Sequence, residues 1–170
     1  TSTNGSRKKI SAHETLHEAA NILADLFNNN KIRLIEEYSA TKADVLCDRD
    51  ELIQALTTLL RNSLQAVLEA RYKSGEGWVR LSTQTQGDKL LIDISDNGIG
   101  ISPANQTKLF EHQFTTKSPE SGTGLGLSIS RRFIRAFSGD LFLVESKPGI
   151  KTCFRIELPL AVEDKKGSAA

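Results

Sequence analysis

Asp96-Asn97-Gly98-Ile99-Gly100 follows an alternating apolar run, Leu90-Leu91-Ile92-Asp93-Ile94-Ser95, which predicts a β-strand. A strand that ends in a carboxylate and two nearby glycines places one fixed hydrogen-bond acceptor beside bare backbone. Because glycine allows positive φ and a close approach of the backbone, this arrangement suits a flat ligand with an exocyclic amino group, such as adenine. Asp-Asn-Gly is also an ordinary turn sequence, so the motif alone does not separate a ligand site from a turn.

Three further motifs surround this stretch in a fixed order. Leu59-Leu60-Arg61-Asn62-Ser63-Leu64-Gln65-Ala66 precedes it, and Leu109-Phe110-Glu111-His112-Gln113-Phe114-Thr115-Thr116-Lys117 and Ser121-Gly122-Thr123-Gly124-Leu125-Gly126-Leu127-Ser128 follow it. Together the four motifs resemble, in chain order, the N, G1, F and G2 boxes of the histidine-kinase ATP-binding domain. That domain belongs to the ATPase superfamily of gyrase B, Hsp90 and MutL. The resemblance covers residues 15–159, and the sequence is most similar to the nitrogen-regulation and dicarboxylate-sensing branch of sensor kinases.

Hydrophobic periodicity predicts the secondary structure around these motifs. Asp48 is expected to cap the second helix, with Glu51 completing a capping box, and Gly139 is expected to close the last helix. Helices and strands mix without a regular βαβ alternation, which indicates an α+β fold, a two-layer sandwich of helices on a mixed β-sheet. The resemblance implies the same architecture, the Bergerat ATP-binding fold. Helices are expected over residues 13–29, 49–72, 102–111 and 124–137, and strands over residues 32–36, 45–47, 78–85, 89–95, 140–145 and 152–158.

Length and charge limit the organisation of the chain. Its 170 residues make one domain with a sizeable core, and we expect a flexible segment over residues 1–10, the ATP-binding domain over 11–160 and a flexible tail over 161–170. A formal net charge of +1 creates no broad field that would recruit nucleic acid or a membrane surface. The sequence has no apolar run long enough for a transmembrane helix. Cys47 and Cys153 are expected to be buried free thiols, which fits a cytoplasmic domain or the cytoplasmic part of a membrane-bound sensor.

Asn62 interrupts the apolar face of the helix that carries the first motif. Asparagine is a poor helix former, so its presence there needs an explanation. One explanation is a core amide bonded to the backbone. The other is a magnesium ligand, because Mg²⁺ prefers hard oxygens and takes one or two protein groups besides phosphates and waters. The resemblance favours the second explanation and implies ATP and Mg²⁺ as cofactors.

Thr58 lies four residues before Asn62 and shares its helix face. Gyrase B and Hsp90 carry a glutamate at this position, which orients the attacking water, and histidine kinases usually carry asparagine. A hydroxyl is a poor general base near neutral pH, so the threonine argues against robust ATP hydrolysis and leaves full kinase competence open. Gln65 stands where many kinases have a basic residue that reaches phosphate, although the nitrogen-sensing branch tends to have glutamine there.

The resemblance assigns a further set of residues to the adenine end of the nucleotide. Asp96 would accept a hydrogen bond from the adenine amino group, which disfavours guanine. Gly98, Gly100 and Ile101 would let the ring approach the backbone. Thr152 would support the aspartate from a neighbouring strand, although its strand propensity alone also explains its presence.

The last motif is assigned to the triphosphate, because free amides at a helix N-terminus bind phosphate oxygens. A Rossmann interpretation fails, since the glycines are spaced G-x-G-x-G after a polar segment. Residues 101–123 would form the ATP lid. In it, Lys117 either neutralises the β- or γ-phosphate or is an ordinary exposed lysine. Phe110 and Phe114 anchor the lid, contact a docked partner helix or simply pack in the core. The contacts expected from the lid and the following helix are Phe114, Thr115, Thr116, Lys117, Gly122, Thr123, Gly124, Leu125, Gly126 and Leu127.

Family kinases transfer the γ-phosphoryl group to a histidine on a separate helical-hairpin domain, and from there to an aspartate of a response regulator. His13-Glu14-Thr15 is only faintly similar to the acceptor motif, so we expect the acceptor-histidine dimerisation domain to lie outside this sequence. The expected partners are that domain and a response regulator, in a full-length homodimer, with no nucleic acid and no direct membrane contact by this domain. The alternatives are a nucleotide-binding pseudokinase and an ATPase of the gyrase B, Hsp90 or MutL type, against which Thr58 argues.

Overall fold

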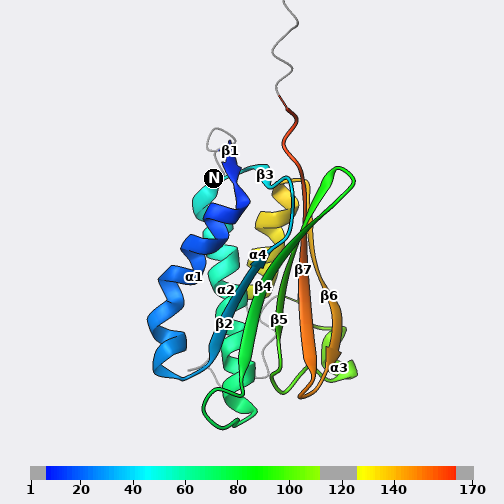
Figure 1. Ribbon diagram of the computed structural model, residues 1–170. Coiled ribbons are helices and arrows are strands. Elements are labelled where there is room, and N and C mark those ends of the chain that lie inside the picture. Colours follow the sequence, from blue (N-terminus) through cyan, green and yellow to red (C-terminus); the bar gives the residue numbers. More distant parts are fainter. Residues whose placement is uncertain (1–6, 112–125, 164–170) are drawn as a thin grey trace, which may run out of the picture.

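The computed structural model describes residues 7–111 and 126–163 (Figure 1). The predicted elements are present in the predicted order, and most of their ends differ from the prediction by a few residues. In chain order the elements are β1 (Lys8–Ser11), α1 (Ala12–Asn29), β2 (Arg33–Tyr38), β3 (Asp44–Cys47), α2 (Arg49–Glu69), β4 (Trp78–Gln86), β5 (Lys89–Asp96), α3 (Pro103–Gln106), α4 (Gly126–Ala136), β6 (Asp140–Lys147) and β7 (Lys151–Pro159). The structure adds one strand, β1, that was not predicted.

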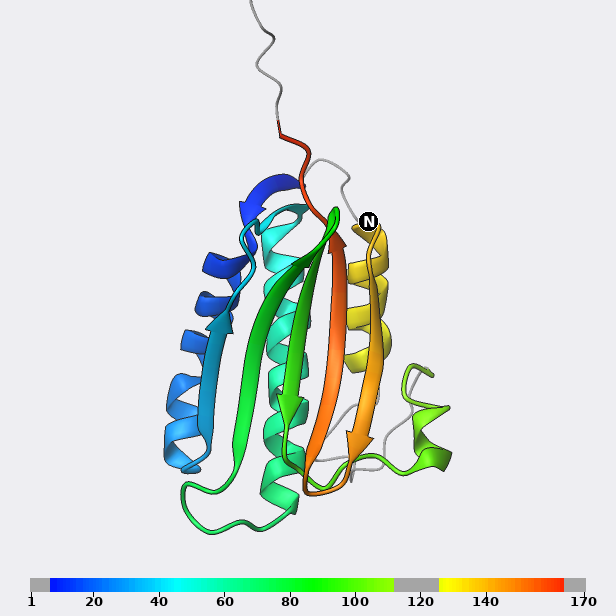
Figure 2. The same ribbon diagram turned by 45° about the vertical axis from the view of Figure 1, so that its right-hand side comes forward.

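The main sheet has five strands in the order β2-β4-β5-β7-β6. β2 runs parallel to β4, and the other neighbours are antiparallel, so the sheet is mixed. α1, α2 and α4 lie side by side on one face of this sheet, with α2 between the other two (Figure 2). The predicted α+β two-layer sandwich is therefore confirmed. β1 and β3 form a separate antiparallel pair.

The core lies between the helical layer and the sheet. Leu90, Ile92 and Ile94 alternate along β5 and are each 0% exposed, as the alternating pattern of the sequence requires. The buried face of α2 repeats leucine with helical spacing, and full burial of each such side chain stabilises the fold by roughly 1.5–3 kcal/mol. Asp48 caps α2 as predicted, because its side chain accepts a hydrogen bond from the Glu51 amide at 3.0 Å.

Two predictions about helices were wrong in ways that the structure explains. The helix expected over residues 102–111 is only the short α3, because the side chains of Gln106 and Thr107 bond to the carbonyls of Ile101 and Ala104 and compete with helical bonding. The residue that closes α4 in the left-handed conformation is Ser138, at φ 64°, and not Gly139. Gly139 is needed for another reason: a Cβ there would lie 2.1 Å from the Glu157 carbonyl oxygen on β7.

The N-terminal boundary also differs from the expected one. Residues 8–10, which we expected to belong to a flexible segment, form β1 and pair with residues 45–47 of β3. Backbone bonding to β3 therefore orders this part of the chain, although its polar sequence gave no sign of a strand. Among residues 7–111 and 126–163, no helix is both long and apolar enough to span a bilayer.

Candidate nucleotide-binding site

Asp96 is the last residue of β5, and its side chain is 2% exposed. Its Oδ1 accepts a hydrogen bond from the Gly98 amide at 2.8 Å, which is the bond of an Asx turn. The central strand therefore buries this carboxylate, and the turn that follows fixes its orientation. A buried, oriented carboxylate at the edge of the core is what recognition of an exocyclic amino group requires.

α2 contacts the loop that follows Asp96. The Ile99 amide donates to the Ala66 carbonyl oxygen at 3.1 Å. A Cβ at Gly98 would lie 2.5 Å from the Ala66 backbone carbon, which no side chain can tolerate. Glycine at position 98 is thus required by the approach of α2, a reason that the sequence motif alone did not indicate.

The β6–β7 turn supports the same loop from the other side. The Gly149 amide donates to the Gly98 carbonyl oxygen at 2.9 Å. Gly100 adopts φ 76°, and a Cβ there would lie 2.9 Å from the Pro148 Cα. Tyr72, which follows α2, donates from its hydroxyl to the Asn97 carbonyl oxygen at 2.7 Å. Sequence reasoning missed Tyr72 and this turn, because both lie far from the motif in the chain.

A short chain of hydroxyl groups lies next to Asp96. Thr152 is directly opposite Asp96 in the β5–β7 register and is 3% exposed, which places it where the resemblance expected a supporting threonine. Its Oγ1 lies 2.8 Å from the Oγ of Ser146, and that oxygen accepts the Ile101 amide at 2.9 Å. Ser146 therefore links the loop to Thr152. The sequence contained no signal for it beyond a polar residue near a strand end.

Thr58, Asn62 and Ala66 form a line along α2, because residues four apart share a helix face. At one end of this line Ala66 contacts the loop after Asp96. At the other end Thr58 contacts the start of α4, since a Cβ at Gly126 would lie 2.8 Å from the Thr58 Cγ2. Asn62 is half-buried and lies between these two contacts. The structure thus brings the predicted metal ligand between the adenine end and the helix assigned to phosphate.

The other predicted residues fall into three groups. Gln65 is half-buried on α2 and donates from Nε2 to Glu69 at 3.3 Å, so its amide already has a partner. Gly126 and Leu127 open α4, and Ile101 is bonded through its amide as described. The remaining ones lie outside the described residues: Phe114, Thr115, Thr116, Lys117, Gly122, Thr123, Gly124 and Leu125.

Phe110 is the last aromatic residue that the structure describes in the segment assigned to the lid. The guanidinium carbon of Arg131 lies 4.3 Å from the centre of its ring, which is cation–π geometry. Arg131 and Arg135 both donate to Oδ1 of Asp140, at 3.3 and 3.0 Å. Burial opposes ionisation of Asp140, but these bonds and the Leu141 amide outweigh it and hold the pKa of the carboxyl below its ordinary value. Phe110 is therefore joined to α4 and β6 through one arginine.

His13 lies elsewhere, where α1 packs against β2 and β4. Its Nε2 is 2.8 Å from the Thr83 hydroxyl, and its ring stacks on Tyr38 with centroids 5.0 Å apart. Burial lowers the pKa of His13. These contacts give the histidine a role in packing α1.

Comparisons with known proteins agree with this geometry. Residues 47–162 match the family model described as histidine kinase-, DNA gyrase B-, and HSP90-like ATPase. The signal transduction histidine-protein kinase AtoS of Escherichia coli K12 is 38% identical over 76% of this chain and 20% of its own length. The sensory histidine kinase/phosphatase NtrB of Escherichia coli O157:H7 is 34% identical over 92% of this chain and 45% of its own length. The chain thus spans less than half of either relative.

The solved catalytic domain of histidine kinase ThkA has the same fold. It aligns with a TM-score of 0.77 at 23% identity, over 90% of this chain and 95% of that domain. At this identity the likeness bears on architecture alone. It confirms the sandwich of helices on a mixed sheet that the sequence predicted.

Proposed function

The chain belongs to the histidine kinase-, DNA gyrase B-, and HSP90-like ATPase family as an ATP-binding catalytic domain of the sensor histidine kinase type, and we propose that it catalyses phosphoryl transfer from ATP to a histidine. The acceptor would lie on a separate dimerisation domain of a homodimeric full-length protein, and a response-regulator aspartate would receive the group next. The observation that carries this proposal is the line of Thr58, Asn62 and Ala66 on α2. It joins a buried, oriented Asp96 to the start of α4.

We propose that adenine lies beside Asp96 and the triphosphate beside the start of α4. The carboxylate would accept a hydrogen bond from the adenine amino group, and guanine would present a carbonyl there instead. The proposed contacts of the base are Gly98, Gly100, Ile101 and Thr152. The proposed contacts of the phosphates are Gln65, Phe114, Thr115, Thr116, Lys117, Gly122, Thr123, Gly124, Leu125, Gly126 and Leu127.

Asn62 is the proposed ligand of Mg²⁺. A neutral amide oxygen is a hard donor and adds no charge that would repel phosphate. Among the described residues, no three His, Cys, Asp or Glu side chains gather in a group that could hold a metal ion. This fits a metal that takes one protein ligand and receives the rest of its coordination from phosphates and waters. When bound, the ion would neutralise charge on the phosphates.

The transfer step needs alignment and charge neutralisation more than a strong base, and a neutral histidine is itself a nucleophile. Thr58 supplies no carboxylate to activate water, and its methyl group packs against α4 at Gly126. Both features support transfer to a histidine over hydrolysis by water. They also disfavour a conformational ATPase of the gyrase B, Hsp90 or MutL type. The proposed setting is the cytoplasm.

Calorimetric titration with ATP tests the nucleotide site. We expect saturable binding that is tighter with Mg²⁺ than without it, and no comparable binding of GTP. Equal affinity for ATP and GTP would contradict the assignment of Asp96. Asp96→Asn should weaken ATP binding by about 30-fold, because the amide can present a donor where an acceptor is required and about 2 kcal/mol is lost.

Asn62→Asp tests the metal ligand. We expect the rate of phosphoryl transfer from Mg-ATP to fall by roughly tenfold or more, because the added carboxylate repels phosphate. Asn21→Asp on the outer side of α1 adds the same charge far from the site and should leave nucleotide use unchanged. Normal transfer by Asn62→Asp would exclude this residue as the metal ligand.

Addition of a separately made acceptor-histidine domain separates the kinase from a pseudokinase. The kinase should label that histidine with the γ-phosphate of radiolabelled ATP, and labelling should disappear in Asn62→Asp. A pseudokinase would bind ATP with the same affinity and label nothing. That outcome would keep the nucleotide site and overturn the proposed transfer.

A further inference from the structure

β2 is an edge strand of the main sheet, and its outer edge is open to a groove. The Arg33 amide donates to the Gly77 carbonyl at 3.1 Å and the Ser39 amide donates to the Thr83 carbonyl at 3.2 Å, so odd-numbered residues bond toward β4. Alternation along a strand directs the backbone groups of Leu34 and Glu36 the other way. The opposite edge strand, β6, is interrupted by a register shift between Leu143 and Glu145, whereas β2 pairs with β4 without a break. β2 therefore lacks the bulge that protects an edge strand from pairing.

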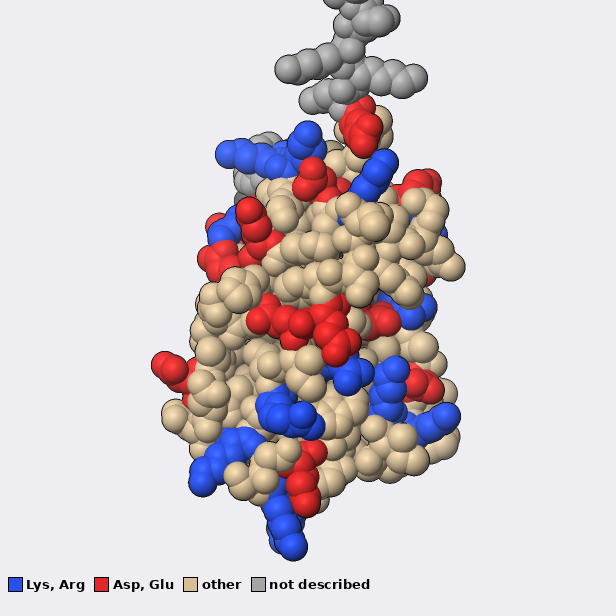
Figure 3. Space-filling view, in the orientation of Figure 1, with Lys and Arg blue, Asp and Glu red and all other residues tan. Residues whose placement is uncertain are grey.

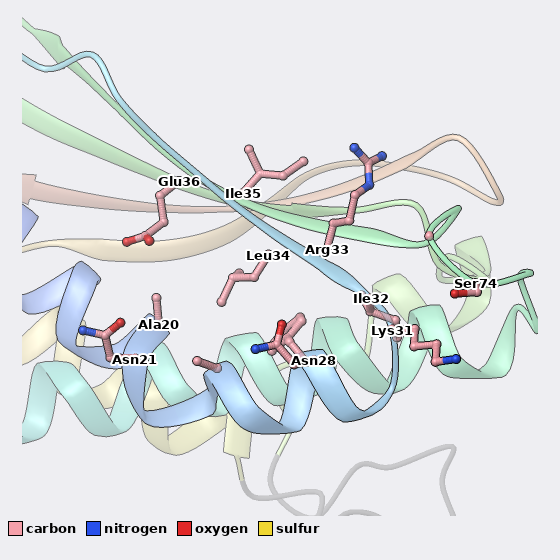
Figure 4. A pocket seen from close by; sticks show the side chains of 13 residues that line it. Ala20, Asn21, Asn28, Lys31, Ile32, Arg33, Leu34, Ile35, Glu36 and Ser74 are labelled. Carbon is pink, nitrogen blue, oxygen red and sulfur yellow. The ribbon is translucent and has the colours of Figure 1, made fainter.

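The groove lies between α1 and β2 and has a volume of about 590 Å³ (Figure 4). Leu34 points from β2 toward α1, and Ala20, Ala24 and Phe27 supply the apolar part of the wall on α1. None of the residues that line the groove belongs to the candidate nucleotide site. The space is therefore a second concave surface of the molecule, with a strand edge as one wall and a helix as the other.

Two asparagines line the α1 side of this groove. Asn21 and Asn28 are seven residues apart, hence on the same helix face, and both are exposed. Neither side chain makes a hydrogen bond to another described residue. An amide side chain offers one acceptor and two donors, which are the groups that an extended peptide backbone can bond. The groove thus has hydrogen-bonding groups on both walls.

One end of the groove is strongly basic. Lys31 and Arg33 line it, and a smaller cavity of about 180 Å³ continues past Lys31 and is lined by Arg71 and Lys73. None of these four cations forms an ion pair within residues 7–111 and 126–163. At the other end the carboxylate of Glu36 is bonded to His17 at 2.9 Å. Figure 3 shows the same division, with Lys and Arg side chains predominating over the lower part of this face and an acidic band across its middle.

We propose that this groove binds an extended acidic polypeptide segment, which adds to the sheet as a sixth strand beside β2. Its backbone pairs with the outward groups of Leu34 and Glu36, while Asn21 and Asn28 on α1 bond to polar groups on the face that it turns toward the helix. Its small apolar side chains pack beside Leu34 and Ala24, and its carboxylates lie at the end formed by Lys31, Arg33, Arg71 and Lys73. Strand addition supplies affinity through the main chain, and the charges fix the direction and the choice of partner.

The test uses a fluorescein-labelled peptide of alternating threonine and valine that ends in three aspartates. Fluorescence anisotropy should show saturable binding that weakens with added salt, and amide NMR shifts should concentrate on residues 33–38 and on α1. A peptide with prolines at the central valines cannot pair as a strand and should not bind. A peptide that ends in three lysines should not bind either.

Charge-reversing substitutions test whether the peptide binds in this groove. Lys31→Glu with Arg33→Glu should weaken binding by about tenfold, because two attractive charges at this end become repulsive toward the carboxylates of the peptide. Lys9→Glu, an exposed cation on β1, is the matched control and should change nothing. ATP titration and circular dichroism should be normal in both variants, so a failure to fold is recognised.

Five results would overturn the proposal, and the first four concern peptide binding. They are no saturable binding up to about 1 mM peptide, equal binding of the proline peptide, equal binding by the charge-reversed variant, and complete competition by inorganic phosphate at the same concentration. A concentration-dependent dimer in sedimentation that disappears in the charge-reversed variant would also overturn it, because the occupant would then be a second copy of the chain.

Discussion

The loop after Asp96 and the packing of α1 on β2 are stabilised by different kinds of contact. The loop is fixed mainly through bonds to its own backbone: the Ile99 amide bonds to α2, and the Gly98 carbonyl bonds to the β6–β7 turn. The side chains of Tyr72 and Ser146 also bond to backbone groups of this loop. The contact of α1 with the edge of the sheet depends instead on side chains, His13 with Thr83 and Tyr38, and His17 with Glu36. Backbone groups do not titrate, and their close contacts leave little space for an added side chain. Contacts between titratable side chains change with pH, and one of the residues can be replaced without moving the chain.

This difference indicates how each region can be altered. In the loop, the position of the Asp96 carboxylate depends on close approach of the chain at Gly98, so a single added methyl group should disturb ligand binding. At α1, loss of one side-chain contact should change stability slightly and leave the nucleotide site unaffected. The predictions below follow from this contrast.

Gly98→Ala should have the largest effect. Its Cβ would lie 2.5 Å from the Ala66 backbone, so α2 or the loop must move, and we expect the free energy of unfolding to fall by about 3 kcal/mol together with loss of ATP binding. Urea denaturation and calorimetric titration measure the two quantities.

Gly87→Ala is the matched control for that change. Gly87 has φ 60° in the β4–β5 turn, and nothing lies within 4 Å of its added Cβ. The free energy of unfolding should fall by only roughly 1–2 kcal/mol, because alanine is strained in the left-handed conformation. The variant should bind ATP normally. If the two alanine variants unfold at the same urea concentration, the close approach of α2 is not what requires glycine at position 98.

Tyr72→Phe should have an intermediate effect. The hydroxyl donates to the Asn97 carbonyl at 2.7 Å, and its loss should cost about 1 kcal/mol of stability and weaken ATP binding a few-fold, because the loop loses a support. Tyr38→Phe removes a hydroxyl that donates to Glu36 at 2.6 Å on the α1 side. That variant should leave ATP affinity unchanged. Equal losses of affinity in the two variants would show that the two regions are coupled and not separate.

The sequence predicted the fold and the position of the loop because both depend on patterns that are local in the chain. Alternating apolar residues predicted β5, and Asp96 with two glycines predicted a tight turn at its end. The contacts that fix this turn are not local: Ala66, Tyr72 and Ser146 come from other elements, and only the packing of α2 and β6 brings them to it.

Helix ends show the same limit in another form. Lys31, Arg71 and Ser138 adopt positive φ after α1, α2 and α4, where glycine is the usual residue, so the sequence could not identify them. Gly139 predicted the end of α4 at nearly the right place, although Ser138 is the residue that adopts the left-handed conformation. Close contact with β7 is what excludes a side chain at Gly139.

The smallest expected effect is the pH dependence of the α1 contact. Burial holds the pKa of His13 below its ordinary value of 6.5, so the unfolded chain binds more protons than the folded one between the folded-state pKa and 6.5. The contribution of His13 to the free energy of unfolding should therefore be fully present above pH 6.5. It should be lost as the pH drops through the folded-state pKa. Because the ring is only partly buried, the loss should be smaller than the effects of Gly98→Ala and Tyr72→Phe on stability.

His13→Gln tests this prediction, because glutamine can bond to Thr83 but does not titrate. Urea denaturation from pH 7.5 to pH 5 should show a smaller decrease in stability for the variant than for the unaltered chain. ATP affinity at pH 7.5 should be equal in both, since His13 packs α1 on the side of the molecule remote from Asp96. If the variant keeps the full pH dependence, another group is responsible for it. If it loses ATP affinity as well, side-chain packing at α1 contributes to the nucleotide site, and the division between a backbone-fixed loop and a side-chain-fixed helix is wrong.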